Sequence, residues 1–191
     1  MMKPNDTIVD TDIWVYLVLS NFYERVIRYH GKLYFSDVVE REIMKWQGNI
    51  GTSKKIAQMF EQLKRKNQLV VISIDDFSSL ERMSIDHQLS EYGLKTVHIA
   101  EKNKGEFVSF LYAMHKDIHK MKTNDRKFVE EIIGTHYEIE IEHWLDLLDV
   151  HANTPKEKQD AMNKVKMLEV KMKKEHPSNV DPRWEKLKGL V

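Results

Sequence analysis

The chain has 191 residues, a length that allows one domain with a substantial core or one domain with an appendage. It contains no cysteine, which excludes disulfides, thiolate metal sites and thiol nucleophiles, so its chemistry must rest on carboxylates, histidines or hydroxyls. Its formal net charge of zero argues against a protein that binds nucleic acid by positive charge alone.

The N-terminal part of the chain begins with a short apolar run and a helical pattern. Residues 8–9 are apolar and lead into Asp10, and the dense apolar residues of 13–27 are typical of a buried helix. The longest apolar stretch, residues 13–19, is far too short to cross a bilayer, and the N-terminus lacks the pattern of a signal peptide. We therefore expect a cytoplasmic protein without a membrane partner.

Strands and helices alternate in the next part of the chain. Residues 33–36 have the pattern of a strand, whereas 37–46 and 53–66 have apolar residues at helical spacing. Residues 69–74 are almost entirely apolar and β-branched, which predicts a strand covered on both faces. Residues 75–92 then have a helical pattern, and its expected buried side chains are Leu80, Met83 and Leu89.

The same alternation continues to residue 141 and sets the expected fold. A helix opens at residue 104, residues 119–123 form a weak strand, and 137–141 show the period-two pattern of an edge strand. Strands that alternate with helices imply βαβ units, so we predict an α/β fold, a three-layer α/β/α sandwich with a mainly parallel sheet. Ligands bind such sheets at the carboxyl ends of the strands, where Asp10 and Asp125 should share one edge.

The last part of the chain differs in charge and in pattern. We place one domain at residues 1–153 and a charged C-terminal helix and tail at 154–191, with Thr154 as the helix cap and Pro155 in the first turn. From Lys156 to the end, ten Lys plus Arg stand against six Asp plus Glu, so this part carries +4 and the rest carries −4. Its apolar stripe should pack against the domain or against a second subunit in a homodimer.

Four short motifs place acids beside the expected strands and helices. They are residues 8–12 (IVDTD), 35–43 (FSDVVEREI), 105–106 (GE, before an apolar helix) and 122–126 (KTNDR). In their order, spacing and placement they resemble the motifs of PIN-domain ribonucleases over roughly residues 5–150. Asp12 departs from the asparagine that is common there, and adds either a charge or only a hydrogen-bond acceptor to the site.

This resemblance implies a metal-dependent endoribonuclease that hydrolyses RNA. Four acids of such enzymes hold Mg²⁺ or Mn²⁺, and the matching residues here are Asp10, Glu42, Glu106 and Asp125. Spacing from Ser36 favours Glu42 over Glu40. The residues expected to hydrogen-bond these ligands or their water are Thr11, Asp12, Thr123 and Asn124.

The chemistry of phosphodiester hydrolysis explains why several acids are needed. The reaction requires an activated water and a stabilised leaving oxygen, and a divalent ion held by carboxylates supplies both. Hard oxygen ligands suit Mg²⁺ and Mn²⁺. Four carboxylates brought together without cations would repel one another, so the set predicts a bound metal.

Other interpretations of the same residues stay open. Asp10 and Asp12 also resemble the nucleophile and the acid/base of haloacid-dehalogenase-like phosphatases, although the later lysine and glycine-aspartate motif of that family are not evident. A catalytically inactive PIN-like scaffold that binds RNA or protein is a third interpretation. Small bacterial PIN proteins are often toxins, so an antitoxin or another protein partner is compatible with this chain. Taken singly, each acid is also typical of a helix cap.

Two further pairs of polar residues are assigned no catalytic role. His115 and His119 lie four residues apart, but no third metal ligand accompanies them. Asp75 and Asp76 follow an expected strand, which is also where a residue of the site would lie. They are nevertheless better explained as caps of the next helix.

Overall fold

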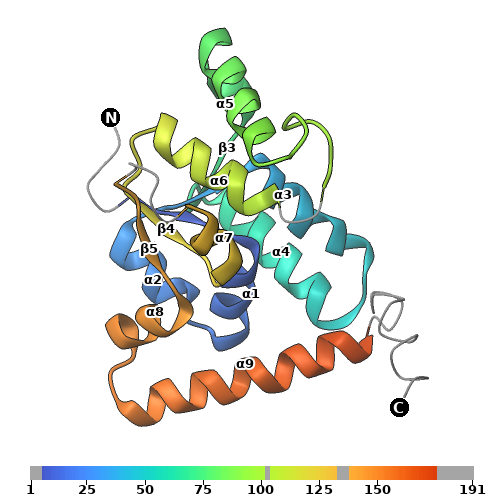
Figure 1. Ribbon diagram of the computed structural model, residues 1–191. Helices are drawn as coiled ribbons and strands as arrows, with labels where there is room; N and C mark the ends of the chain where they lie inside the picture. The colour runs from blue at the N-terminus through green and yellow to red at the C-terminus, as the bar shows by residue number, and fades with distance from the viewer. Residues whose placement is uncertain (1–5, 102–103, 133–137, 176–191) are drawn as a thin grey trace, which may run out of the picture.

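The fold is built on a five-stranded parallel sheet. The computed structural model describes residues 6–101, 104–132 and 138–175. Within them the strand order is β3-β2-β1-β4-β5, and every neighbouring pair is parallel (Figure 1). The strands are β1 (Ile8–Val9), β2 (Leu33–Ser36), β3 (Leu69–Ile72), β4 (Lys120–Lys122) and β5 (Glu140–Glu142). The predicted α/β class and parallel sheet are confirmed.

Helices cover both faces of the sheet and complete the predicted three-layer sandwich. The helices described are α1 (Thr11–Ser20), α2 (Tyr23–His30), α3 (Asp37–Met44), α4 (Gly51–Arg65), α5 (Ser79–Glu91), α6 (Lys104–His115), α7 (Arg126–Ile132), α8 (Trp144–His151) and α9 (Pro155–Glu175), with 3₁₀ helices η1 (Lys45–Gly48) and η2 (Ile74–Asp76). Successive side chains of a strand point to opposite faces. Val9 therefore belongs to the core that buried residues of α1, α2, α4, α8 and α9 also form, whereas Ile8 belongs to the core formed with α5, α6 and α7.

One of the two edge strands differs from what its apolar pattern suggests, and the other agrees with its pattern. β3 is an edge strand that ends at Ile72, and its Val70 and Val71 are only half-buried, so the expectation of full cover for this strand is wrong. The opposite edge is β5, as the alternating pattern at 137–141 predicted. That strand spans Glu140–Glu142, and residue 137 lies outside the described residues.

The apolar segment 13–27 forms two helices rather than one. α1 ends because Asn21 adopts a left-handed backbone with φ of 68°, and its N–H donates to the carbonyls of Leu17 and Val18. Asparagine tolerates this conformation better than most residues that carry a side chain. Neither helix, nor any other in the described part of the chain, is long and apolar enough to cross a membrane.

Helix α5 projects from the body of the molecule (Figure 1). Leu80 and Met83 lie on its solvent-facing side and are 80% and 70% exposed, contrary to the prediction that they are buried. Ile85 and Leu89, nearer to α6, are the residues that α5 buries. Leu80 and Leu89 are nine residues apart and so lie on opposite sides of the helix, which means that only one of the two can face the body.

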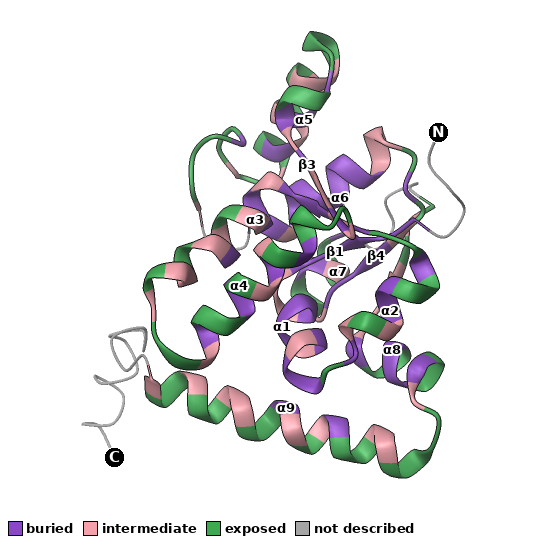
Figure 2. Ribbon diagram, turned by 180° about the vertical axis from the view of Figure 1, so that it is seen from behind, coloured by how far each residue is buried: buried purple, intermediate pink, exposed green. Residues whose placement is uncertain are grey.

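Helix α9 lies along the body and packs on α1 and α4 (Figure 2). Thr154 caps it as predicted, because its side-chain oxygen accepts the N–H of Glu157 at 3.1 Å. Ala161 and Val165 are buried in the same core as α1. Its far end is fastened too, since the carboxylate of Glu175 accepts the backbone N–H of Thr52 at 2.8 Å. The described part of the C-terminal extension is thus integrated with the domain.

Candidate metal centre

The sheet brings the four predicted ligands to one edge. Asp10 directly follows β1 and precedes α1, and Asp125 lies three residues beyond β4. Because β1 and β4 are parallel neighbours, these two acids lie at the same carboxyl edge. Glu42 lies in the last turns of α3, and Glu106 lies in the first turn of α6.

Asp10 is the most deeply buried of these acids, with 2% of its surface exposed. One carboxylate oxygen accepts the backbone N–H of Thr11 at 2.7 Å, and the other accepts the hydroxyl of Thr123 at 3.2 Å. Burial, followed by repulsion from Glu106 and Asp12, raises the pKa of Asp10 well above its usual range. The fold therefore positions this carboxylate firmly and strongly disfavours its negative charge.

The negative charges of Asp12 and Glu106 are disfavoured for the same reasons. Burial is the main cause that raises the pKa of Asp12 to about 6, even though its carboxylate accepts the N–H groups of Ile13 at 2.6 Å and Asn124 at 3.2 Å. Burial also raises the pKa of Glu106 to about 7, and the charges of Glu42 and Asp125 add to the effect. Asp12 therefore contributes a charge as well as a hydrogen-bond acceptor.

The Glu42 side chain contacts Thr11 and does not line the open pocket described below. The Thr11 hydroxyl donates to its carboxylate at 2.7 Å. A Cβ atom on Gly105 would lie 3.4 Å from both Glu42 carboxylate oxygens, so the glycine allows α6 to approach this acid closely. Glu40, two residues earlier, pairs instead with Lys64 at 2.5 Å. The helix register thus turns Glu42 to the cluster and Glu40 away from it.

Asp125 and its neighbours combine capping with a place in the cluster. The Asp125 carboxylate accepts the N–H groups of Lys127 at 2.9 Å and Phe128 at 3.0 Å, and so caps α7. The side-chain oxygen of Asn124 accepts the N–H of Trp144 at 2.9 Å, so this amide fixes the start of α8. Its backbone N–H, not its side chain, reaches Asp12. Asp125 can therefore cap α7 and belong to the acid cluster at the same time.

The acids surround an open pocket of about 400 Å³. Its lining residues are Asp10, Thr11, Asp12, Val15, Tyr16, Trp46, Glu106, Asn124, Asp125 and Glu169. The sequence interpretation missed Val15, Tyr16, Trp46 and Glu169. Spacing carried a partial signal, since Tyr16 is one helical turn after Asp12 and Glu169 is one turn after the buried Val165. Nothing local showed that α9 crosses this edge of the sheet.

The chemistry of this donor set fits a hard divalent cation, although the side chains do not enclose one as they stand. Among the described residues, no group of three or more histidine, aspartate or glutamate side chains is arranged to hold a metal ion. The carboxylates instead border a shared pocket and raise one another's pKa. Such mutual repulsion between oxygen ligands is what a cation relieves.

The other polar candidates lie outside this pocket. Asp75 pairs with Arg82 at 3.0 Å, and Asp76 accepts the N–H of Ser73 at 2.8 Å as a cap. His119 lies 3.5 Å from Asp117 and is well exposed. None of these residues lines the acid pocket.

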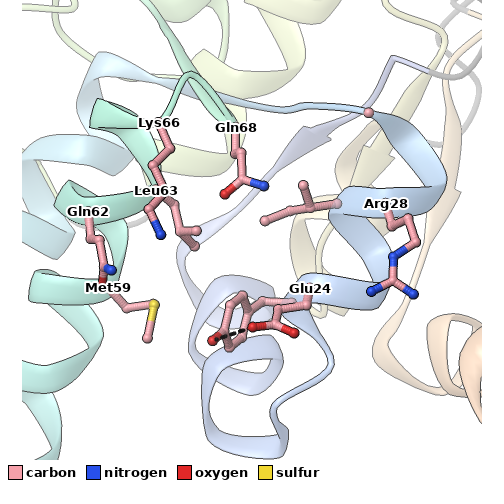
Figure 3. A pocket seen from close by; sticks show the side chains of 10 residues that line it. Glu24, Arg28, Met59, Gln62, Leu63, Lys66 and Gln68 are labelled. Atoms are coloured by element: carbon pink, nitrogen blue, oxygen red, sulfur yellow. Dashed lines mark hydrogen bonds between the residues drawn. The ribbon is translucent and has the colours of Figure 1, made fainter.

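A second pocket, of about 460 Å³, lies between α2 and α4 (Figure 3). Arg28 and Lys66 are on its borders, and Glu24 is the one acid among its lining residues. The hydroxyl of Tyr23 hydrogen-bonds the Glu24 carboxylate at 3.3 Å. This pocket has no cluster of carboxylates, so the acid pocket is the better candidate for chemistry.

No protein-family model matches the chain, and no curated protein matches it in sequence. The resemblance to PIN-domain ribonucleases therefore rests on the four motifs alone. What the site can do chemically is indicated by the geometry of the acid pocket.

Proposed function

We propose that this chain is a Mg²⁺- or Mn²⁺-dependent endoribonuclease of the PIN type, acting at the acid pocket. The observation that carries the proposal is the convergence of acids from separate elements on one pocket at the carboxyl edge of a parallel sheet. Burial and mutual repulsion raise the pKa of Asp10, Asp12 and Glu106. Such a cluster of acids lowers the stability of the folded state, so it points to a function that requires it. Cation binding is the simplest such function.

The residues that would hold the cation are Asp10, Glu106 and Asp125, which line the pocket, and Glu42, which lies outside that lining and joins the cluster through the Thr11 hydroxyl. A bound divalent ion supplies an activated water and neutralises charge on the phosphodiester. The chain's own hydrogen bonds keep the ligands in place, since Thr11 fixes Asp10 through its N–H and Glu42 through its hydroxyl. Thr123 similarly joins Asp10 to the backbone of Asp125. These contacts orient the carboxylates before any substrate arrives.

The phosphatase interpretation is less well supported. It requires Asp12 as an acid/base, but both oxygens of Asp12 already accept backbone N–H groups. It also requires a lysine near the nucleophile Asp10, and no lysine is among the described residues that line this pocket. A scaffold without catalysis leaves the crowding of acids unexplained, because their repulsion opposes folding.

A cleavage assay with matched substitutions tests the proposal. Purified protein should cut single-stranded RNA with Mn²⁺ or Mg²⁺, lose the activity in EDTA, and leave p-nitrophenyl phosphate intact. Asp10→Asn and Asp125→Asn should each abolish cleavage without unfolding the protein. Asp75→Asn is the control, because the same change is made at an exposed acid paired with Arg82 outside the pocket. Near-wild-type cleavage by both pocket variants would refute the assignment.

A further inference from the structure

The acid pocket is also lined by aromatic rings. Tyr16 lines it from α1, and Trp46 lines it from η1, which directly follows the helix that carries Glu42. Both side chains are half-buried and pack with the core beneath. Each ring is thus anchored on one side and borders the pocket on another.

Two side chains lie close to the ring of Tyr16. It packs edge-on against Trp144, with ring centroids 5.7 Å apart. Its hydroxyl also lies near the carboxylate of Glu169 on α9. Burial, and next the charge of Glu169, raises the pKa of Tyr16 to about 12, so the phenol is neutral at physiological pH. Both residues line the acid pocket, so α9 borders this ring.

The charge of the pocket limits how it can bind a nucleic acid. Its ten lining residues include five acids and no lysine or arginine. Side-chain cations at this pocket therefore cannot supply the usual attraction for phosphates. Base faces stack on aromatic side chains by contacts that do not require positive charge. The two rings are the part of the lining best suited to hold a nucleotide.

We propose that Tyr16 and Trp46 form a stacking subsite for the base of a nucleotide next to the scissile phosphate. This inference rests on the proposed ribonuclease function and adds the residues that select the substrate. A base can reach these rings only when it has left its own stack, so the subsite takes an unpaired nucleotide. Glu169 extends this role to α9, which lies outside the region that resembles PIN domains.

Steady-state cleavage of a short single-stranded oligoribonucleotide tests the subsite. With saturating Mn²⁺, Tyr16→Ala and Trp46→Ala should each raise KM by between about 5-fold and about 150-fold, the range measured for loss of one stacked base. Tyr16→Phe and Trp46→Phe keep a ring for stacking, so each should raise KM less than the matching alanine variant. Titration of Mn²⁺ should give the same affinity in all four variants, because no metal ligand is changed.

A substrate change separates stacking from general damage to the fold. An oligoribonucleotide with an abasic site beside the scissile phosphate lacks the partner of the rings. The wild type should lose affinity for it, whereas Trp46→Ala should lose nothing further, so the two penalties are not additive. On the abasic substrate the alanine variants and the wild type should cut equally well.

The failures of the two proposals are distinguishable. Additive penalties, or an unchanged KM in both alanine variants, would overturn the stacking subsite and leave the ribonuclease assignment standing. A wild-type protein that cuts neither the intact nor the abasic oligoribonucleotide with Mn²⁺ would overturn both.

Discussion

Replacing Glu106 by glutamine removes one carboxylate from the acid pocket with almost no change in shape. Burial and the charges of Glu42 and Asp125 raise the pKa of Glu106 from 4.5 to about 7 in the folded protein. Between these two values the folded state binds a proton that the unfolded state has released. The free energy of unfolding contributed by this group therefore falls as the pH rises through that window.

The size of the effect follows from the same pKa difference. Applied to a group with a pKa of 4.5 unfolded and about 7 folded, linkage gives a loss of about 2–3 kcal/mol between pH 5 and pH 8. Glu106→Gln lacks this loss. In the absence of metal, its stability relative to wild type should therefore be greater at pH 8 than at pH 5 by that amount. In melting temperature this corresponds to roughly 4–12 °C for a chain of this size.

Thermal unfolding in EDTA, at pH 5 and at pH 8, measures this difference directly. Groups that do not interact with Glu106 cancel in this comparison, and the relief of Asp10, whose pKa the charge of Glu106 raises, acts in the same direction. Saturating Mn²⁺ at pH 8 should then raise the wild-type stability by about 2.7 kcal/mol at a hundredfold excess over the dissociation constant. Glu106→Gln should gain less. An equal gap between the two metal-free proteins at both pH values would refute the electrostatic reasoning.

Three further substitutions examine the site and its support. Glu42→Gln should lower RNA cleavage strongly in a kinetic assay, whereas Glu40→Gln, at an acid paired with Lys64, should not; the reverse result would shift the helix register. Gly105→Ala should reduce cleavage slightly, because its Cβ would lie 3.3 Å from Val39 Cγ2 and 3.4 Å from the Glu42 carboxylate oxygens, so that α3 or α6 must shift by a small amount; unchanged kinetics would show that the two helices accommodate the methyl group. Val165→Ala should lower the free energy of unfolding by about 2 kcal/mol in urea titrations. Val170→Ala, at a residue 53% exposed on the same helix, should change it little, and equal effects would contradict the packing of α9.

The placement of the four acids was predictable because it depends on local order. A strand that ends in an acid, within a parallel sheet, puts that acid at the carboxyl edge whatever the rest of the chain does. Asp10 and Asp125 illustrate this rule. The direction of the Glu42 side chain depends only on the register of α3, which the spacing from Ser36 predicted. The contact of Glu42 with Thr11 agrees with that register.

The rest of the pocket could not be predicted because it depends on tertiary contacts. Glu169 lies more than 150 residues after Asp12, and its position follows from how α9 crosses α1 and α4. Trp46 has the apolar character of a core residue, and nothing in its neighbours shows that it borders an opening. The exposure of Leu80 and Met83 has the same origin, since α5 carries apolar residues on two sides and only tertiary contacts decide that Ile85 and Leu89 are the buried ones.

The contact between Glu175 and α4 joins the start of that helix to the end of α9, the last helix in the described part of the chain. Ile50, at the start of α4, provides no side-chain cap, and the carboxylate that accepts the Thr52 N–H comes from 123 residues further along the chain. The start of α4 and the acid pocket therefore both depend on α9, since Glu175 accepts the Thr52 N–H and Glu169 lines the pocket. A local opening that detaches α9 would uncover the N-terminus of α4 and remove Glu169 from the pocket in the same event, so hydrogen exchange at Thr52 should report on the integrity of the pocket.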